Sequence, residues 1–202
     1  MLRYNRWANL TLLEACRGLT GAQLDAVTPG IGGSVRALLL HIIGGEQTFV
    51  LRTQGRQYEG ELNRGSQWTG FDDLIAIATR TSDDLIAIAE EMDEEGTIDL
   101  AWQGKSFRFP RRFFLVHAVA HGAEHRTEVK TALAQQGVPT PDLDAWQYAS
   151  AMGYGAEVIG DSCRAAARAT ARIRRQMPKD PASFPPASLG LETPRTVRVD
   201  DR

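Results

Sequence analysis

The sequence contains few cysteines and no long apolar run. Its two cysteines, Cys16 and Cys163, stand far apart and outside any CxxC spacing, so they offer neither a disulfide framework nor a thiolate metal site. The longest apolar stretch runs from Ala37 to Ile43 and is interrupted by His41, whereas a membrane-spanning helix needs about 20 apolar residues. The sequence therefore predicts reduced thiols and no membrane span.

Neither sign of charge dominates the chain. It has 23 Lys and Arg residues against 25 Asp and Glu residues, a net charge of -2 at pH 7, and so lacks the polycationic character that drives binding to nucleic acids or membranes. A local exception is a row of arginines at helical spacing: Arg164, Arg168, Arg172 and Arg175. We interpret this row as a solvated helix face, with a nucleic-acid-binding face as the alternative. We expect no nucleic-acid partner.

The composition is that of one globular domain. With 43% hydrophobic and 24% charged residues over 202 positions, the chain can bury a core, and single cores usually occupy about 100–200 residues. Residues 1–13 place Arg3, Arg6 and Asn9 among their apolar positions and show no cleavage-site pattern. We therefore expect no signal peptide and a cytoplasmic location.

Hydrophobic periodicity predicts an all-α fold with four long helices. We place them at residues 2–17, 35–51, 72–92 and 111–136. Ser34 stands where the N-cap of the second helix belongs, and Pro110 fits the first position of the fourth helix. Residues 97–109 alternate around Gln103-Gly104-Lys105, which predicts a short hairpin before the fourth helix.

The C-terminal part differs from the rest in composition. Asp142 can cap a fifth segment that ends at Met152, and an Ala-rich stretch follows. Five of the nine prolines lie from Pro178 onward, where few large apolar groups remain to be buried. We therefore divide the chain into a body at residues 1–154, a helical extension at 155–176 and a Pro-rich flexible tail at 177–202.

Histidine is the informative residue type. There are four, and His117, His121 and His125 stand four residues apart, a spacing that sets them in a stripe on one helix face. His41, the fourth, lies in the apolar run of the second helix, where a buried imidazole needs a partner. Neutral imidazole is the commonest ligand of zinc, nickel and related ions. The pattern predicts a metal site built by two packed helices.

Two alternatives compete with this interpretation. Each histidine can instead be a hydrogen-bonded core or surface residue. The run from His121 to His125 also matches the H-x-x-E-H motif of inverted zinc peptidases, but the acidic residues downstream of it stand in no matching pattern. His117 lies about 12 Å from His125 along the helix axis, so we expect it to orient a ligand or substrate instead of binding the same ion.

Together these residues resemble the DinB/YfiT-like family of small metal-binding helical bundles. Tyr4-Asn5-Arg6-Trp7-Ala8-Asn9 is similar to the opening motif of the family, Gly33-Ser34-Val35-Arg36 with Leu40-His41-Ile42 to its second helix, and His117 through His125-Arg126 to its third motif. The resemblance covers residues 1–154. Two positions depart from the pattern: Glu124 stands where many members have a second histidine, and Thr127 where many have glycine.

The resemblance implies an up-and-down four-helix bundle with a metal triad of His41, His121 and His125 and with His117 beside it. It also implies a homodimer and a small-molecule substrate. Characterised relatives include transferases and isomerases that use a low-molecular-weight thiol such as mycothiol or bacillithiol.

Three protein nitrogens leave open positions on an ion, which is typical of catalytic sites. A thiol or water bound there loses its proton near neutral pH. We therefore expect a metal-dependent thiol S-transferase-like enzyme, with Glu46 and Glu124 as candidate proton-handling groups. A metal-dependent hydrolase and a non-enzymatic metal-binding bundle of the stress response are the alternatives. Zinc or nickel is the expected ion, with iron or manganese also compatible with three imidazoles.

Overall fold

The computed structural model describes residues 1–56, 62–92 and 96–154. This part of the chain is mostly helical and carries one small sheet. Its elements, in order, are α1 (Leu2–Cys16), α2 (Gly21–Asp25), α3 (Val35–Thr53), α4 (Phe71–Glu91), β1 (Thr97–Trp102), β2 (Lys105–Pro110), α5 (Arg112–Gln135) and α6 (Ala145–Ala151). The expected helical extension and Pro-rich tail lie outside the described residues.

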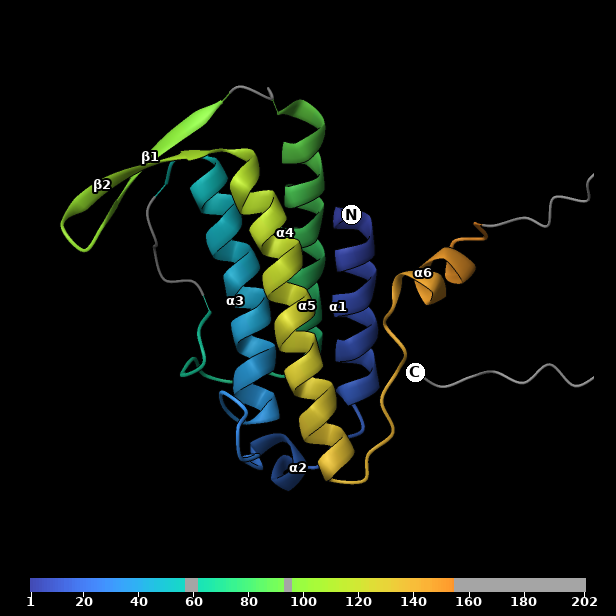
Figure 1. Cartoon of the computed structure of the whole chain (residues 1–202). Coiled ribbons are helices and arrows are strands. Elements are labelled where there is room, and N and C mark those ends of the chain that lie inside the picture. The colour runs from blue at the N-terminus through green and yellow to red at the C-terminus, as the bar shows by residue number, and fades with distance from the viewer. Residues whose placement is uncertain (57–61, 93–95, 155–202) are drawn as a thin grey trace, which may run out of the picture. The chain divides into compact units, whose positions relative to one another are not determined.

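The long helices α1, α3, α4 and α5 lie side by side (Figure 1). α3 packs against α4 and α5, and α1 packs against the same two helices. The expected up-and-down order is wrong in one respect, because α3 and α4 run in the same direction (Figure 1). A short turn after α3 would have reversed the chain, whereas Arg64 and Trp68, which precede α4, lie against Gly32 and Arg36 at the end of the molecule where α3 begins.

The main core fills the space between these helices. Its buried side chains are mostly aliphatic, and most come from α1, α3, α4 and α5; among them are Leu12, Leu38, Ile42, Ala78 and Leu133. A second cluster lies where the hairpin meets the helices. There Ile98 and Leu100 of β1 pack with Phe49 of α3 and Phe114 of α5. The alternation of residues along β1 places Ile98 and Leu100 on the same, core-facing side.

The structure confirms one of the three expected helix-start signals and corrects the other two. Ser34 caps α3 as expected, since its hydroxyl accepts a hydrogen bond from the Ala37 amide at 3.3 Å. The expected cap at Asp142 is wrong, because Asp144 accepts from the Gln147 amide at 2.7 Å and begins α6. Pro110 does not begin α5. It ends β2 opposite Thr97, a strand-end position at which proline is tolerated.

The hairpin was predicted correctly, with a turn one residue shorter than expected. Lys105 already pairs with Trp102, so Gln103 and Gly104 form the turn alone. Their φ angles are 48° and 72°, the left-handed pair that two-residue hairpin turns require. Glycine adopts this conformation without strain.

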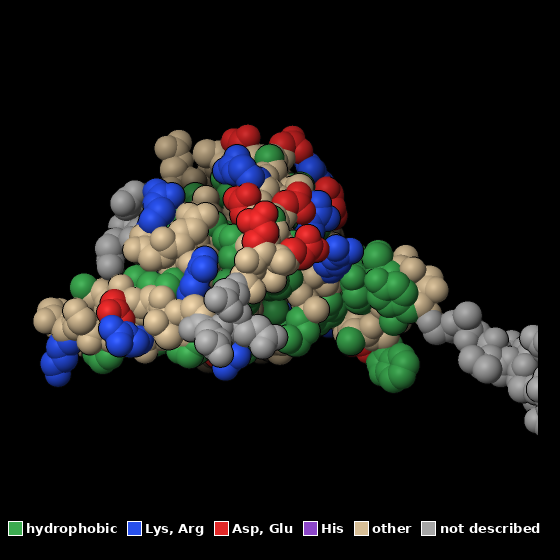
Figure 2. All heavy atoms as spheres, turned by 90° about the horizontal axis from the view of Figure 1, so that it is seen from above, with side chains coloured by type: hydrophobic (Ala, Val, Ile, Leu, Met, Phe, Trp, Pro, Cys, Tyr) green, Lys and Arg blue, Asp and Glu red, His purple; other side chains and the backbone are tan. Residues whose placement is uncertain are grey.

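Figure 2 views the end of the molecule at which α1 begins and α4 ends, and shows acidic and basic side chains gathered together there. Two ion pairs join α1 to α4: Arg3 with Glu90 at 2.9 Å and Arg6 with Asp83 at 2.8 Å. Among the described residues, no helix has the length and apolar character to cross a membrane.

Candidate metal centre

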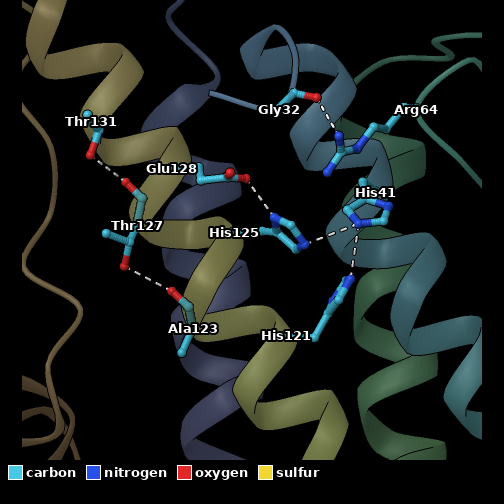
Figure 3. A network of polar contacts seen from close by, with 9 residues as sticks. All are labelled: Gly32, His41, Arg64, His121, Ala123, His125, Thr127, Glu128 and Thr131. Atoms are coloured by element: carbon cyan, nitrogen blue, oxygen red, sulfur yellow. Dashed lines mark hydrogen bonds and ion pairs between the residues drawn. The ribbon is translucent and has the colours of Figure 1, made fainter. Parts of the chain in front are cut away.

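Three histidines from two helices point toward one another (Figure 3). His41 comes from α3, and His121 and His125 come from α5. The Nε2 atom of His41 lies 3.1 Å from the Nε2 of His125 and 3.1 Å from the Nε2 of His121. One ring nitrogen from each histidine lies within 4.8 Å of the others. We call these three residues the histidine cluster.

The spacing of these nitrogens fits a shared ion. Two adjacent nitrogens bound at about 2.0–2.1 Å to one ion lie about 2.8–3.0 Å apart in octahedral geometry and about 3.3–3.4 Å apart in tetrahedral geometry, so about 2.8–3.4 Å covers both. The two separations of 3.1 Å fall in this range. The histidine cluster could therefore hold a metal ion.

A glycine on α3 makes the close approach possible. A Cβ atom at Gly45 would lie 2.5 Å from Cε1 of His121 and 3.0 Å from its Nδ1, well inside van der Waals contact. Because glycine weakens a helix interior, its presence in the middle of α3 costs stability. In return, the absence of a side chain at Gly45 leaves room for the His121 imidazole against the backbone of α3.

Burial keeps two of the three imidazoles neutral. It lowers the pKa of His121 to about 3, with further contributions from His125, His41, His117 and Arg64. It likewise lowers the pKa of His41 to about 4. Neutral imidazole is the form that binds metal ions, so both rings are ready to coordinate at physiological pH.

A carboxylate orients the third imidazole. Nδ1 of His125 lies 2.6 Å from Oε2 of Glu128, one helical turn further along α5 (Figure 3). This contact leaves Nε2 of His125 facing His41. A carboxylate on the far nitrogen is typical of metal-binding histidines, because it fixes the ring and makes the ligating nitrogen more basic. His121 differs, since its buried Nδ1 has no hydrogen-bond partner among the described residues.

Arg64 brings a positive charge to the cluster from the connection between α3 and α4. Its guanidinium donates to the carbonyl of Gly32 and lies beside His41 (Figure 3). The same charge helps to lower the pKa of His41 and of His121. A cation at this place favours anionic ligands at the cluster.

A comparison with models of known protein families identifies the family to which the chain belongs. The model of the DinB family matches residues 1–157. The chain belongs to the DinB family. No curated protein and no solved structure matches it. The histidine cluster and all of its contacts lie within the matched residues of this DinB chain.

The structure brings together the three histidines selected from the sequence and leaves His117 outside them. His117 is exposed, and its ring stacks on that of His121 with centroids 6.0 Å apart. The ring of Phe49 packs against both imidazoles; its centroid lies 4.7 Å from that of His117 and 5.5 Å from that of His121. His117 therefore lies beside the cluster, where it can contact a ligand.

Glu46 lies in a buried polar network between α1, α3, α4 and α5. Its carboxylate accepts hydrogen bonds from Asn5 at 2.5 Å, Asn9 at 2.8 Å and Ser82 at 3.0 Å. Arg126 donates to the amide oxygens of the same two asparagines, at 2.7 and 2.6 Å. Burial raises the pKa of Glu46 to about 7 against the opposing effect of these partners.

None of the hydrogen bonds among the described residues links Glu46 to the histidine cluster. Glu124 lies on the exposed face of α5. A proton-handling role for either carboxylate stays a prediction.

Three residues of the site were not selected from the sequence. Glu128 was recognisable in principle, because it stands three residues after His125 on the same helix face. Gly45 stands four residues after His41, but a glycine in a helix does not reveal which side chain approaches it. Nothing in the sequence around Arg64 indicates a role at the site, because its place beside the cluster depends on the path of the chain between α3 and α4.

Proposed function

We propose that this DinB protein is a metal-dependent enzyme of the thiol S-transferase type, with the ion held by His41, His121 and His125 inside a four-helix bundle. The observation that carries the proposal is the convergence of three imidazoles, with the Nε2 atom of His41 3.1 Å from the Nε2 atom of each of the other two. Three protein ligands leave open positions, as catalytic sites do. A bound divalent ion would supply acidity to a thiol, lowering its pKa toward neutral.

The chain's own residues would divide the remaining tasks. Glu128 holds the His125 ring in place. Arg64 places a positive charge beside the cluster, which favours an anionic thiol or an anionic electrophile. His117 and Phe49 border the cluster on one side, where an electrophile would approach.

The first test measures metal content by elemental mass spectrometry on untagged protein, for wild type, His121→Ala and His117→Ala. We expect about one ion per chain in wild type and in His117→Ala, and loss of the ion in His121→Ala. The second test follows conjugation of a low-molecular-weight thiol to an electrophile with the loaded protein. Metal binding without turnover of any thiol, ester or amide would favour the non-enzymatic alternative, in which metal removal lowers the melting temperature only.

Several expectations stay predictions beside this proposal. They are the identity of the ion, the homodimer, the small-molecule substrate, the cytoplasmic location and the absence of a nucleic-acid partner. The arginine row lies outside the described residues, and its interpretation as a solvated helix face stays a prediction.

A further inference from the structure

A cavity of about 310 Å³ lies next to the histidine cluster, between α3, α5 and the hairpin. Phenylalanine rings form most of its wall: Phe49, Phe109, Phe113 and Phe114. Arg52 and His117 supply its polar groups. The volume is at the small end of the range for ligand sites, about 300–1,000 Å³, and mostly apolar walls with a few polar groups are typical of such sites.

The wall is preformed. Phe49 and Phe114 belong to the buried cluster under the hairpin and are 8% and 4% exposed. Phe109 and Phe113 stack on each other with centroids 5.4 Å apart, and Phe109 also contacts Phe114 at 5.5 Å. Phe113 is 42% exposed, so it forms the rim. An aromatic ring entering this cavity would replace water against surfaces that are already fixed.

The cavity adjoins the histidine cluster along two facing helices. On α5, residues 113, 117, 121 and 125 recur at intervals of four, and on α3 residues 41, 45, 49 and 52 lie close to one face. Phe49 and His117 belong to the cavity wall and also contact the ring of His121. Each interval of four residues rises about 6 Å, so a ligand in the cavity lies one to two helical turns from the cluster.

Arg52 places a positive charge in the cavity wall, at the end remote from the cluster. It is half-buried, and none of the hydrogen bonds or ion pairs found among the described residues involves its side chain. An arginine fork beside aromatic walls suits a carboxylate, which accepts two parallel hydrogen bonds. Along α3 and α5, the guanidinium of Arg52 is therefore followed by the aromatic cavity and then by the histidine cluster.

We propose that this cavity binds an aromatic carboxylic acid, with the ring among the phenylalanines and the carboxylate on Arg52, and that it selects the electrophile of the reaction. The reactive group of such a substrate lies on the opposite side of the ring from the carboxylate, toward His117 and the cluster. The assignment as substrate rests on the proposed function, whereas binding to the cavity does not require the ion.

The test uses 3-phenylpropionate and its neutral amide as probes, by isothermal titration against full-length protein kept metal-free with a chelator. Wild type should bind the acid about tenfold more tightly than the amide. Arg52→Gln should weaken the acid about tenfold and leave the amide within twofold. Phe113→Ala should weaken both probes about threefold to tenfold. Arg80→Gln, on the exposed face of α4, removes the same charge elsewhere and should change neither.

Three results would overturn the proposal: no binding of either probe to wild type, binding of the acid that Arg52→Gln leaves unchanged, or binding of the acid only to metal-loaded protein. The last result would mean that the carboxylate binds the ion instead of Arg52. A parallel zinc titration of the same proteins keeps the two proposals separate. A protein that takes up zinc but binds neither probe contradicts the cavity proposal alone, and a protein that binds the acid but takes up no zinc in the zinc titration contradicts the metal site alone.

Discussion

Replacing Gly45 by alanine is the most revealing single change at the histidine cluster. In an ordinary helix interior this substitution stabilises by about 0.5–1 kcal/mol, because alanine loses less backbone freedom on folding. Here the new methyl group would lie 2.5 Å from Cε1 of His121. Non-bonded carbons keep about 3.5 Å or more, so the ring must move by about 1 Å.

A shift of that size is large on the scale of metal coordination. Ligand distances in working sites vary by about 0.2 Å, so a displacement of about 1 Å removes His121 from the ion. Changes that only disturb a supporting group cost about 10–100-fold in affinity, and we expect at least that loss for Gly45→Ala. The variant should also fail to gain the helix stabilisation.

Zinc affinity is measured by competition with a chromophoric chelator, and stability by thermal melting of the metal-free protein. Gly21→Ala in α2 is the matched control, since nothing lies within 4 Å of a Cβ there. It should leave zinc affinity unchanged. If Gly45→Ala binds zinc like wild type and melts at a higher temperature, zinc binding does not require the His121 ring to lie against Gly45, and the reasoning is refuted.

Three further predictions concern the surroundings of the cluster. Glu128→Gln should weaken zinc binding about 10–100-fold, while Glu124→Gln on the exposed face of the same helix should not change it, by the same chelator competition. Asn9→Ala should lower the free energy of unfolding by about 1–3 kcal/mol in urea titrations, because it leaves a buried carboxylate and a buried guanidinium short of one partner each. Metal-free protein should lose stability as pH falls from about 6.5 toward about 4: the unfolded chain protonates its histidines near pH 6.5, whereas the folded pKa values of His41 and His121 are about 4 and about 3.

Each of these has a contrary outcome. Equal zinc affinities for the two glutamate variants would show that the contact with His125 does not support the site. Wild-type stability of Asn9→Ala would show that the network around Glu46 is not needed for folding. A melting temperature that stays level in the acid range, or that falls equally in metal-free His121→Gln, would show that burial of the imidazoles does not set the pH dependence.

The parts of the fold that follow local rules were predictable. Ser34 before an apolar run marks the start of α3, and alternation around Gly104 marks the hairpin. The direction of α4 was not predictable, because it depends on where the chain travels between two helices. Pro110 shows the limit of local rules, since its missing N–H is tolerated both at a helix start and at the end of a strand.

The candidate site also combines features that local sequence rules predict with features that only the packed structure shows. The interval of four residues between His121 and His125 fixes their common face on α5, and His41 was the remaining histidine in an apolar helix. What the sequence concealed was the environment of each group. Asn5 and Asn9 belong to an amphipathic helix, and only the packed structure shows that they hold Glu46 and Arg126 together in the core.

The central claim is that three imidazoles share one ion, and X-ray absorption spectroscopy of the zinc-loaded protein tests it most directly. We predict an absorption fine structure with three imidazoles at about 2.0–2.1 Å and light-atom ligands in the remaining positions, with one imidazole fewer in any His121→Ala protein that retains zinc. A spectrum with fewer than three imidazoles in wild type, or with sulfur ligands, would contradict the account.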